Sequence, residues 1–222
     1  SNGALSASSD MYIETGTLNV NAIVSVNNLY DYFGTAVINI AGGSSLSVAG
    51  GTYGNYGGVI NGPGDLIKYS AGTLDLFGAD QINPGSLIVN DGTVNVNDGA
   101  LGSAVKVLVN STGTTTGVLN VLDSETIGSL AGTGANGQVN ISSGATLTTG
   151  GDNSSTTFAG KIAGDGALTK AGTGAMTLTG INTYAGGTSI TGGSIRGYAG
   201  TTPTNGSLQG DIDVALGASV MF

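Results

Sequence analysis

Short runs of alternating apolar and polar residues recur along the whole sequence, and no run has the spacing of a helix. Each run places two or three aliphatic residues at every second position, which is the period of a β-strand with one buried face. Gly, Asn, Asp, Ser and Thr stand between the runs, and Gly and Asn accept the positive φ that tight turns demand. Representative runs lie at residues 17–21, 37–40, 87–89, 105–109 and 118–122. The pattern predicts an all-β chain made of many short strands.

The sequence also contains an internal duplication. A set of glycine, aliphatic and lysine positions recurs later in the chain, in the same order and at one constant spacing. The positions are Gly62, Gly64, Leu66, Lys68, Gly72, Leu76, Gly78, Gly85 and Ile88, with the counterparts Gly164, Gly166, Leu168, Lys170, Gly174, Leu178, Gly180, Gly187 and Ile190. Further upstream, at a spacing one residue shorter, the matching positions are Asn39, Ile40, Gly43 and Leu46 with Asn140, Ile141, Gly144 and Leu147. One repeat unit therefore occurs twice, at about 36–95 and 137–197.

Strands as short as these cannot bury an apolar face alone, so neighbouring units must stack on one another. No segment has the apolar spacing of a crossover helix, which excludes βαβ units. We therefore expect a right-handed parallel β-helix, or β-solenoid, in which residues 1–222 form a single elongated segment. A coil of roughly 20 to 25 residues would give about ten rungs. An antiparallel sandwich or a propeller is the alternative, and the 42 glycines fit it less well.

Composition restricts the partners of the chain. Charged residues make up only 9% of it, so the surface that faces water must consist mainly of Ser, Thr and Asn. The 14 acidic and 5 basic residues give a net charge of −9, which repels phosphate backbones. No apolar run approaches the roughly 18 residues of a membrane span. We expect no nucleic-acid partner and no direct membrane insertion of this segment.

The residues needed for catalysis or metal binding are scarce. Histidine is absent, which removes zinc sites and Ser-His-Asp triads. Most carboxylates stand in turns next to glycine, where an Asx turn accounts for them. The close carboxylate pairs are Asp123 with Glu125 and Asp211 with Asp213, and neither pair has a basic neighbour. We therefore predict no catalytic residue, no metal site and no cofactor, and a groove lined by Asp123 or Glu125 is what would support a glycan-acting enzyme instead.

Two lysines occupy the same place in the two copies of the repeat. They are Lys68 and Lys170. A residue needed in both copies suggests a structural role, such as an aliphatic stem that lies along a ladder with its charged end in water. A catalytic lysine needed twice is less plausible.

Aromatic residues gather in the N-terminal third. The candidate contact residues for a partner are Tyr30, Tyr32, Phe33, Tyr53 and Tyr56, and the stretch that corresponds to the first three in the second copy has no aromatic residue. Exposed tyrosines anchor protein or glycan partners because they bury a large area at low entropic cost. The alternative, which we favour, is that they cap the end of the β-helix or pack in its core, because a solenoid end must cover its apolar interior.

One segment resembles a known family. Residues 158–188 read FAGKIAGDGALTKAGTGAMTLTGINTYAGGT, and this segment closely resembles the passenger-associated repeat of type V autotransporters. The flanking segments 127–132 and 207–212 are similar to passenger sequences of the same family. Residues 62–76 look like a degenerate copy of the repeat, and the resemblance weakens before about residue 36.

The resemblance implies a β-helical passenger that is exported through the outer membrane by its own C-terminal barrel, with a repeat that assists folding outside the cell. We expect that barrel to be absent from this chain. The Gly-Asp-Ser-Gly-Ser motif of serine-protease passengers is also absent, so their activity is not expected here.

We therefore expect a secreted or surface-exposed, non-catalytic segment that mediates adhesion, self-association or host-receptor binding. Its expected partners are a host cell-surface protein, matrix or glycan, or another copy of itself. The alternative is a purely structural stalk that supports folding and displays another effector region.

Overall fold

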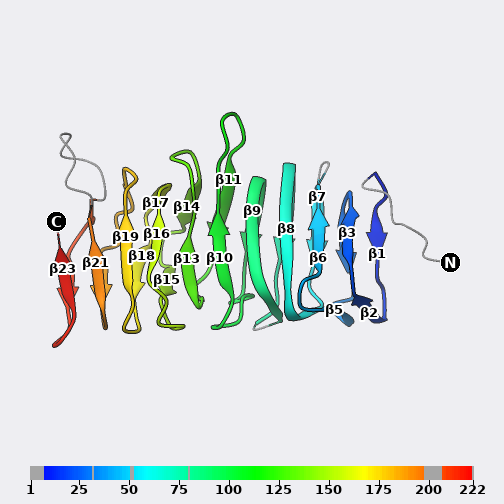
Figure 1. The fold of residues 1–222 in the computed structure, drawn as a ribbon, viewed down its shortest axis with the longest axis horizontal. Helices are drawn as coiled ribbons and strands as arrows, with labels where there is room; N and C mark the ends of the chain where they lie inside the picture. Colours follow the sequence, from blue (N-terminus) through cyan, green and yellow to red (C-terminus); the bar gives the residue numbers. More distant parts are fainter. Residues whose placement is uncertain (1–7, 32, 51–52, 80, 198–206, 222) are drawn as a thin grey trace.

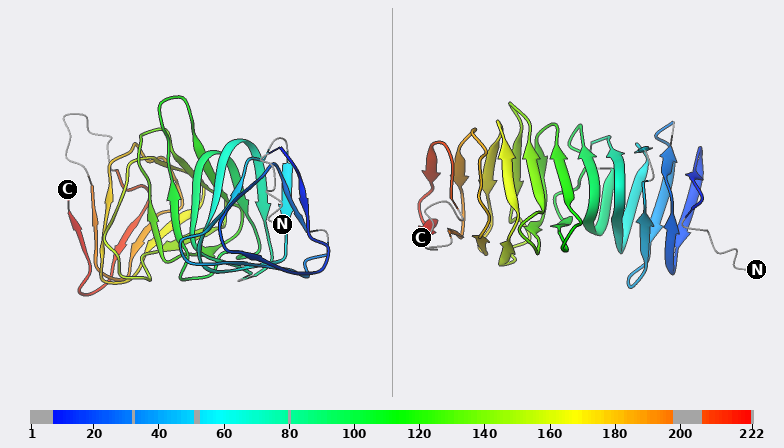
Figure 2. Two further views of the ribbon diagram at one scale, coloured as in Figure 1. Left: turned by 45° about the vertical axis from the view of Figure 1, so that its right-hand side comes forward. Right: turned by 90° about the horizontal axis from the view of Figure 1, so that it is seen from above.

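The computed structural model describes residues 8–31, 33–50, 53–79, 81–197 and 207–221, and they form one elongated stack of coils (Figure 1). In this described part all regular secondary structure is β-strand, so it contains no helix that could cross a membrane. The strands of successive coils pair in parallel, and there are about nine coils. The parallel β-helix is confirmed, with slightly fewer coils than the ten expected. Seen from above, the coils follow one another from β1 (Met11–Tyr12) at one end to β23 (Ser219–Met221) at the other (Figure 2).

The coils contribute strands to three parallel stacks, and the last coils contribute to only two of them. The first stack contains β1, β4 (Leu29–Asp31), β7 (Tyr53–Tyr56), the last parts of β8 (Val59–Leu76) and β9 (Ile82–Val96), β11 (Gly117–Val121), β14 (Gln138–Ile141) and β17 (Lys161–Gly164). The second contains β2 (Gly16–Val20), β5 (Ala36–Ile40) and the first parts of β8 and β9, and its place in later coils is taken by β12 (Glu125–Thr126), β15 (Thr146–Thr149), β18 (Ala167–Lys170), β20 (Thr188–Ile190) and β22 (Ile212–Val214). The third contains β3 (Ile23–Val26), β6 (Ser45–Val48), the middle parts of β8 and β9, β10 (Lys106–Val109) and β13 (Ser129–Ala131), and then β16 (Thr156–Phe158), β19 (Ala175–Leu178), β21 (Ser194–Arg196) and β23.

The interior is filled by ladders of aliphatic side chains. In the second stack Ile38, Ile60 and Ile82 lie above one another in register, and all three are fully buried. Inward residues alternate along each strand with outward ones that reach solvent, as the burial pattern of β5 shows. Burial of one such side chain stabilises the fold by about 1.5–3 kcal/mol, so the ladders supply most of the driving force.

The coils turn corners at glycines where a Cβ would clash with the neighbouring coil. Gly62 has a φ of +111°, and a Cβ placed there would lie 2.2 Å from the carbonyl oxygen of Ile40 in the preceding coil. Gly164, its counterpart in the second copy, has a φ of +99°, and its Cβ would lie 2.1 Å from the carbonyl oxygen of Ile141. The duplicated glycines therefore form the same kind of corner in two places. Gly62 ends the second-stack part of β8 and Gly164 ends β17 of the first stack, and at both the stacked coils approach each other closely.

The duplicated lysines lie inside the coil. Lys68 and Lys170 are fully buried, and their amines donate to backbone carbonyls of nearby turns. The Nζ of Lys68 donates to Ala49 O at 2.7 Å and also to Ser70 O, while the Nζ of Lys170 donates to Gly172 O at 3.3 Å. The expected structural role is what these contacts provide, but the expectation that the charged ends reach water is wrong.

The two copies of the repeat lie on different faces of the coil. Segment 65–68 pairs with β6 in the third stack, whereas the equivalent segment 167–170 is β18 in the second stack. The coils between the copies are longer, because one of them includes the loop at residues 110–116, between β10 and β11 (Figure 1). The constant spacing between the copies is therefore not a whole number of coils but falls one face short of it. The same repeat sequence can form strands on more than one face of the coil.

Candidate binding surface

The outward side chains of the first stack form one continuous file. In strand register it contains Tyr12, Tyr30, Asn55, Asp75, Asn95, Asn120 and Asn140. We call the last five the Asn ladder and the first two the tyrosine stack. The residues that alternate with the ladder, such as Leu74 and Val94, are fully buried, which fixes the ladder on the outer face.

Hydrogen bonds between neighbouring coils connect four of the five members of the Asn ladder, from Asp75 to Asn140. The Nδ2 of Asn95 donates to Asp75 Oδ1 at 2.6 Å. The Nδ2 of Asn120 donates to Asn95 Oδ1, and the Nδ2 of Asn140 donates to Asn120 Oδ1, both at 2.8 Å. Side chains held in this way lose little further freedom when a ligand binds, so the ladder is preorganised.

The tyrosine stack continues the file beyond the ladder. The rings of Tyr12 and Tyr30 are stacked, with centroids 4.8 Å apart and an angle of 11° between the planes. Tyr12 is 57% exposed, and Tyr30 is adjacent in register to Asn55. Two parallel rings with exposed area therefore lie directly beside the polar ladder.

A groove lies at the corner where the ladder strands end. Its volume is about 310 Å³, and it is lined by Asn55, Asp75, Leu76, Phe77, Asn95, Asn97, Asp98 and Leu122. Phe77, Asn97 and Leu122 follow their strands in successive coils, and the N–H of each donates to a carbonyl of the coil before it, at 3.3, 3.1 and 2.9 Å. We call this cavity the corner groove.

Gly57 provides the space for the aromatic side of the corner groove. A Cβ on Gly57 would lie 2.1 Å from Cε2 of the Phe77 ring, so the ring occupies the volume that a side chain would fill. Phe77 is the only aromatic residue among those that line the groove. The missing side chain of one coil thus positions the ring of the next.

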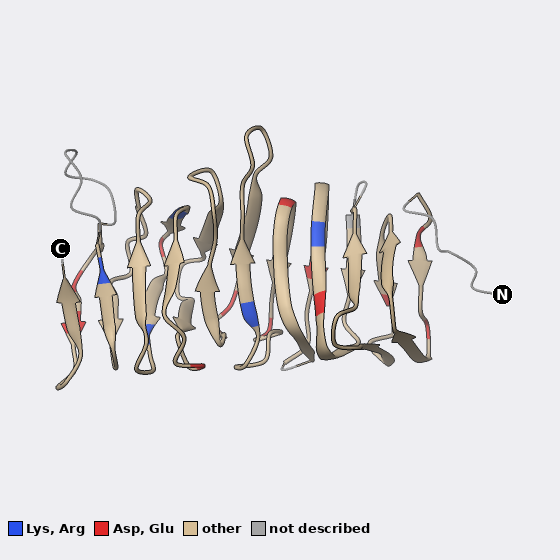
Figure 3. Cartoon of the chain, in the orientation of Figure 1, with Lys and Arg blue, Asp and Glu red and all other residues tan. Residues whose placement is uncertain are grey.

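The corner groove has acidic and neutral polar walls. Asp75 and Asp98 line it, and no lysine or arginine does. The basic residues are spread over other parts of the chain, and two of them are buried (Figure 3). The groove therefore favours hydroxyl, amide or amine groups over anions.

The predicted aromatic contact residues separate in the structure. Phe33 is 68% exposed and Tyr30 belongs to the tyrosine stack, so both lie on the surface. Tyr32 and the side chain of Tyr53 lie outside the described residues, although the backbone of Tyr53 is part of β7. Tyr56 is fully buried, and its hydroxyl lies 3.3 Å from the carbonyl oxygens of Ala36 and Val59.

Tyr56 must therefore be removed from the set of contact residues, because its side chain points into the core. Burial raises the pKa of its phenol well above the usual range, and the nearby Asp31 carboxylate adds to this rise. The alternative role, packing in the core, is the one the structure gives to this residue.

Asp31 holds the turn that presents Phe33. Its Oδ1 accepts the N–H groups of Phe33 and Gly34, and its Oδ2 accepts the N–H of Ala36, all at 3.0 Å. A Cβ on Gly34 would lie 3.4 Å from the carbonyl oxygen of Gly57, so this turn is next to the glycine against which the Phe77 ring packs. An exposed aromatic side chain is thus fixed one coil away from the corner groove.

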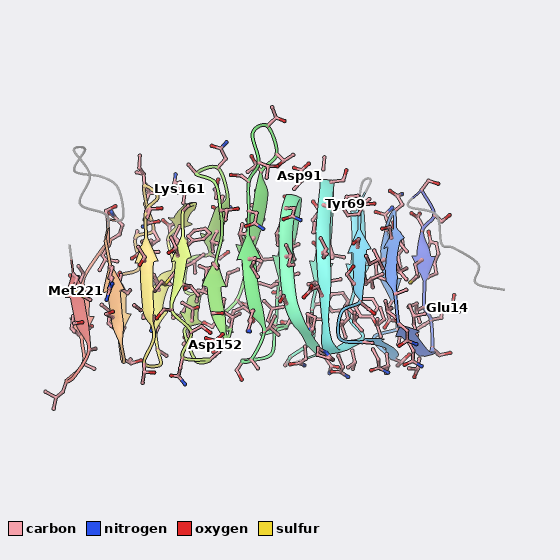
Figure 4. The ribbon with its side chains drawn as sticks, in the orientation of Figure 1. Glu14, Tyr69, Asp91, Asp152, Lys161 and Met221 are labelled. Carbon is pink, nitrogen blue, oxygen red and sulfur yellow. The ribbon has the colours of Figure 1, made fainter. Side chains whose placement is uncertain are left out.

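Neither Asp123 nor Glu125 lines the corner groove. Glu125 is buried and accepts the N–H of Leu101 at 3.2 Å, whereas Asp123 lies on the surface and accepts the N–H of Asp98 at 3.4 Å. Asp91 and Asp152 lie at opposite edges of the molecule (Figure 4). Within the described ranges no three acidic residues come close enough to hold a metal ion.

The Asn ladder was not predicted from the sequence, although a signal for it exists. Asn95, Asn120 and Asn140 each stand between two aliphatic residues of a strand. Their side chains therefore point to the outer face of the strand, opposite the aliphatic side chains. Only the register of the coils shows that these strands are neighbours in one stack.

Comparison with known proteins agrees with the sequence resemblance. Residues 168–196 match the model of the passenger-associated-transport-repeat. The chain is 36% identical over 210 residues to the protein named adhesin BmaC autotransporter from Brucella suis biovar 1 (strain 1330), an alignment that covers 90% of this chain. The chain belongs to the autotransporter passenger family. This passenger segment spans 6% of the length of the Brucella relative, and no solved structure matches it significantly.

Proposed function

We propose that this passenger segment is a non-catalytic adhesive module, displayed on the bacterial surface or released from it after export through the outer membrane. The observation that carries the proposal is the outward file of the first stack, in which stacked tyrosines, a preorganised Asn ladder and the corner groove adjoin one another. Aromatic residues beside fixed polar groups are typical of contact surfaces.

The Brucella relative supports this proposal, because it is named an adhesin and aligns with nearly the whole chain. For this passenger the corresponding partner is a host cell-surface protein, matrix or glycan, or another copy of itself. The net charge of −9 favours contacts through hydrogen bonds and shape over binding to acidic polymers.

Binding of the fluorescently labelled, purified passenger to host cells tests the proposal. The variant Tyr12→Ala/Tyr30→Ala/Asn95→Ala changes the file without reaching the buried ladders. Its matched control is Thr148→Ala/Thr169→Ala/Ser189→Ala, which changes the corresponding outward positions of the second stack.

We expect saturable binding by the unchanged passenger and by the control, and binding at least about tenfold weaker by the file variant. Circular dichroism and thermal unfolding verify that all three proteins are folded. Equal binding by both variants would contradict the choice of surface, and absence of binding by the unchanged passenger would contradict the adhesive function.

A structural stalk is the second candidate, and the repeated corner supports it. The buried lysine and the close glycine corner recur in both copies on different faces, as expected of a unit selected for stacking. In a stalk, deletion of whole coils would impair display of a distal region, whereas surface substitutions would leave cell binding unchanged.

A further inference from the structure

We propose that the corner groove binds an uncharged oligosaccharide, with one or two sugar rings seated between the Asn ladder and Phe77. This inference rests on the adhesive function proposed above and specifies a ligand class for one site within the file. Four properties of the groove favour such a ligand: its size, the groups that line it, its charge and its preorganisation.

The size of the groove suits a small ligand better than a protein segment. Pockets that hold small molecules have volumes of roughly 300–1,000 Å³, and this groove has about 310 Å³. The strands beneath it pair on both sides within the first stack, so an extended peptide has no free sheet edge to extend there. A ligand must therefore contact side chains rather than add a strand.

The groups that line the groove match the two kinds of surface on a sugar. Asn55, Asn95 and Asn97 carry amides that both donate and accept hydrogen bonds, as sugar hydroxyls do. Phe77 and Leu122 place apolar surface beside these amides, and a pyranose ring has an apolar face of C–H groups next to its hydroxyls. A purely apolar ligand would instead leave the amides desolvated without partners, which is unfavourable.

The charge of the groove selects against anionic sugars. Asp75 and Asp98 are the charged residues that line it, and no basic side chain is among the lining groups to pair with a carboxylate or sulfate. Carboxylates accept hydrogen bonds from neutral hydroxyls strongly, so the same residues favour an uncharged glycan. A cationic ligand is the competing occupant that the test must separate.

The site is preorganised on both walls. The hydrogen bond from Asn95 to Asp75 fixes one wall, and the seat above Gly57 fixes the Phe77 ring on the other. In the described part of the chain Asn55 Oδ1 is buried without a hydrogen-bond partner, so the protein itself leaves this end of the ladder unsatisfied.

Nuclear magnetic resonance titration of the ¹⁵N-labelled passenger tests the inference. The neutral probes are maltotriose, cellotriose, lactose and N-acetyllactosamine, the anionic probe is sialyllactose and the cationic probe is spermidine. We expect at least one neutral probe to shift the amide signals of residues 75–77, 95–98 and 122 saturably, with no response to 0.5 M salt beyond about twofold.

Three variants sharpen this titration. Phe77→Ala should weaken the neutral sugar about tenfold or more, because it removes the apolar wall. Gly57→Ala should weaken it by displacing the ring, although no lining group is changed. Asp75→Asn keeps one acceptor oxygen but removes the charge, so it should weaken the neutral sugar by clearly less than it weakens a cation.

The inference is overturned if none of the neutral probes shifts the groove signals, or if only spermidine does and salt abolishes the effect. If cell binding depends on Phe77 while no sugar binds, the groove takes a protein group and the adhesive function stands. If a neutral sugar binds in the groove but the passenger does not bind cells, the sugar site stands and the adhesive function fails.

Discussion

The two copies of the repeat share the same kind of glycine corner but differ in what they present to solvent. Gly62, Lys68 and Leu76 of the first copy have counterparts in the second with equivalent surroundings, including the close approach of Gly62 and Gly164 to a carbonyl of the preceding coil. Asp75 and Phe77, which line the corner groove, are replaced by Thr177 and Thr179. Positions kept in both copies thus maintain the coil, and positions that differ carry the proposed binding site.

The largest effect is expected at the shared corner glycines. Gly62→Ala and Gly164→Ala should each lower the free energy of unfolding by about 3 kcal/mol or more, because the new Cβ meets a carbonyl oxygen at little over 2 Å. Urea unfolding followed by circular dichroism measures the loss. Similar losses in the two copies would support a common structural role.

The matched controls for these variants are Gly43→Ala and Gly144→Ala. Both glycines have positive φ, +76° and +80°, but nothing lies within 4 Å of a Cβ at either position. They should cost only the conformational strain, about 1 to 2 kcal/mol. Equal losses at Gly43 and Gly62 would show that close approach of the coils does not matter.

The buried lysines should make stability depend on pH. Burial lowers the pKa of Lys68 to about 8, partly offset by the Asp91 carboxylate, and burial also lowers the pKa of Lys170. Above pH 8 the unfolded chain holds a proton that the folded chain has lost, so the free energy of unfolding should rise with pH. The rise from Lys68 between pH 8 and 9.5 is up to about 2 kcal/mol.

The pH profile of unfolding by urea checks this prediction, with Lys68→Met as the variant that cannot titrate at this position. Tyr56 and Tyr184 have raised pKa values in the folded protein, so above about pH 10 only the unfolded chain loses these phenol protons. The free energy of unfolding then falls with pH and opposes the rise from the lysines. The measurement should therefore stop below that pH. A profile of the same slope in Lys68→Met would contradict the assignment.

A smaller effect is expected in the Asn ladder. Asn120→Ala removes one donated and one accepted hydrogen bond between coils and should lower the free energy of unfolding by about 1 kcal/mol. Thr169→Ala, at an outward position of the second stack, should change it by less than about 0.5 kcal/mol. Thermal unfolding compares the two variants. A larger loss of stability in Thr169→Ala than in Asn120→Ala would contradict the claim that the ladder hydrogen bonds stabilise the fold.

The sequence was sufficient to predict the architecture, because every coil repeats the same local signals. Alternating aliphatic residues, turn glycines and the duplication at Gly62 and Gly164 all point to stacked parallel strands. The face that each copy occupies was not predictable, since it depends on the lengths of the intervening coils, including the loop at 110–116. Those lengths are visible only once the strands are placed in register.

The site was harder to predict for the same reason. Tyr56 and Asn55 are adjacent in the sequence, yet one side chain fills the core and the other lines the corner groove. A one-residue change in the assumed strand phase exchanges them, and the short β7 strand, Tyr-Gly-Asn-Tyr, has no aliphatic residue to fix that phase. The corner groove itself joins residues from four coils that no local pattern connects.

The most direct test of the account exchanges the groove residues for their counterparts in the other copy. The variant Asp75→Thr/Phe77→Thr gives the first copy the residues found at 177 and 179, and Thr177→Ala/Thr179→Ala is the matched change in the second copy. Binding isotherms on host cells should show a loss of about tenfold or more for the first variant and less than about twofold for the second, with both proteins folded. Equal binding by the two variants would contradict the claim that the groove of the first copy makes the contact.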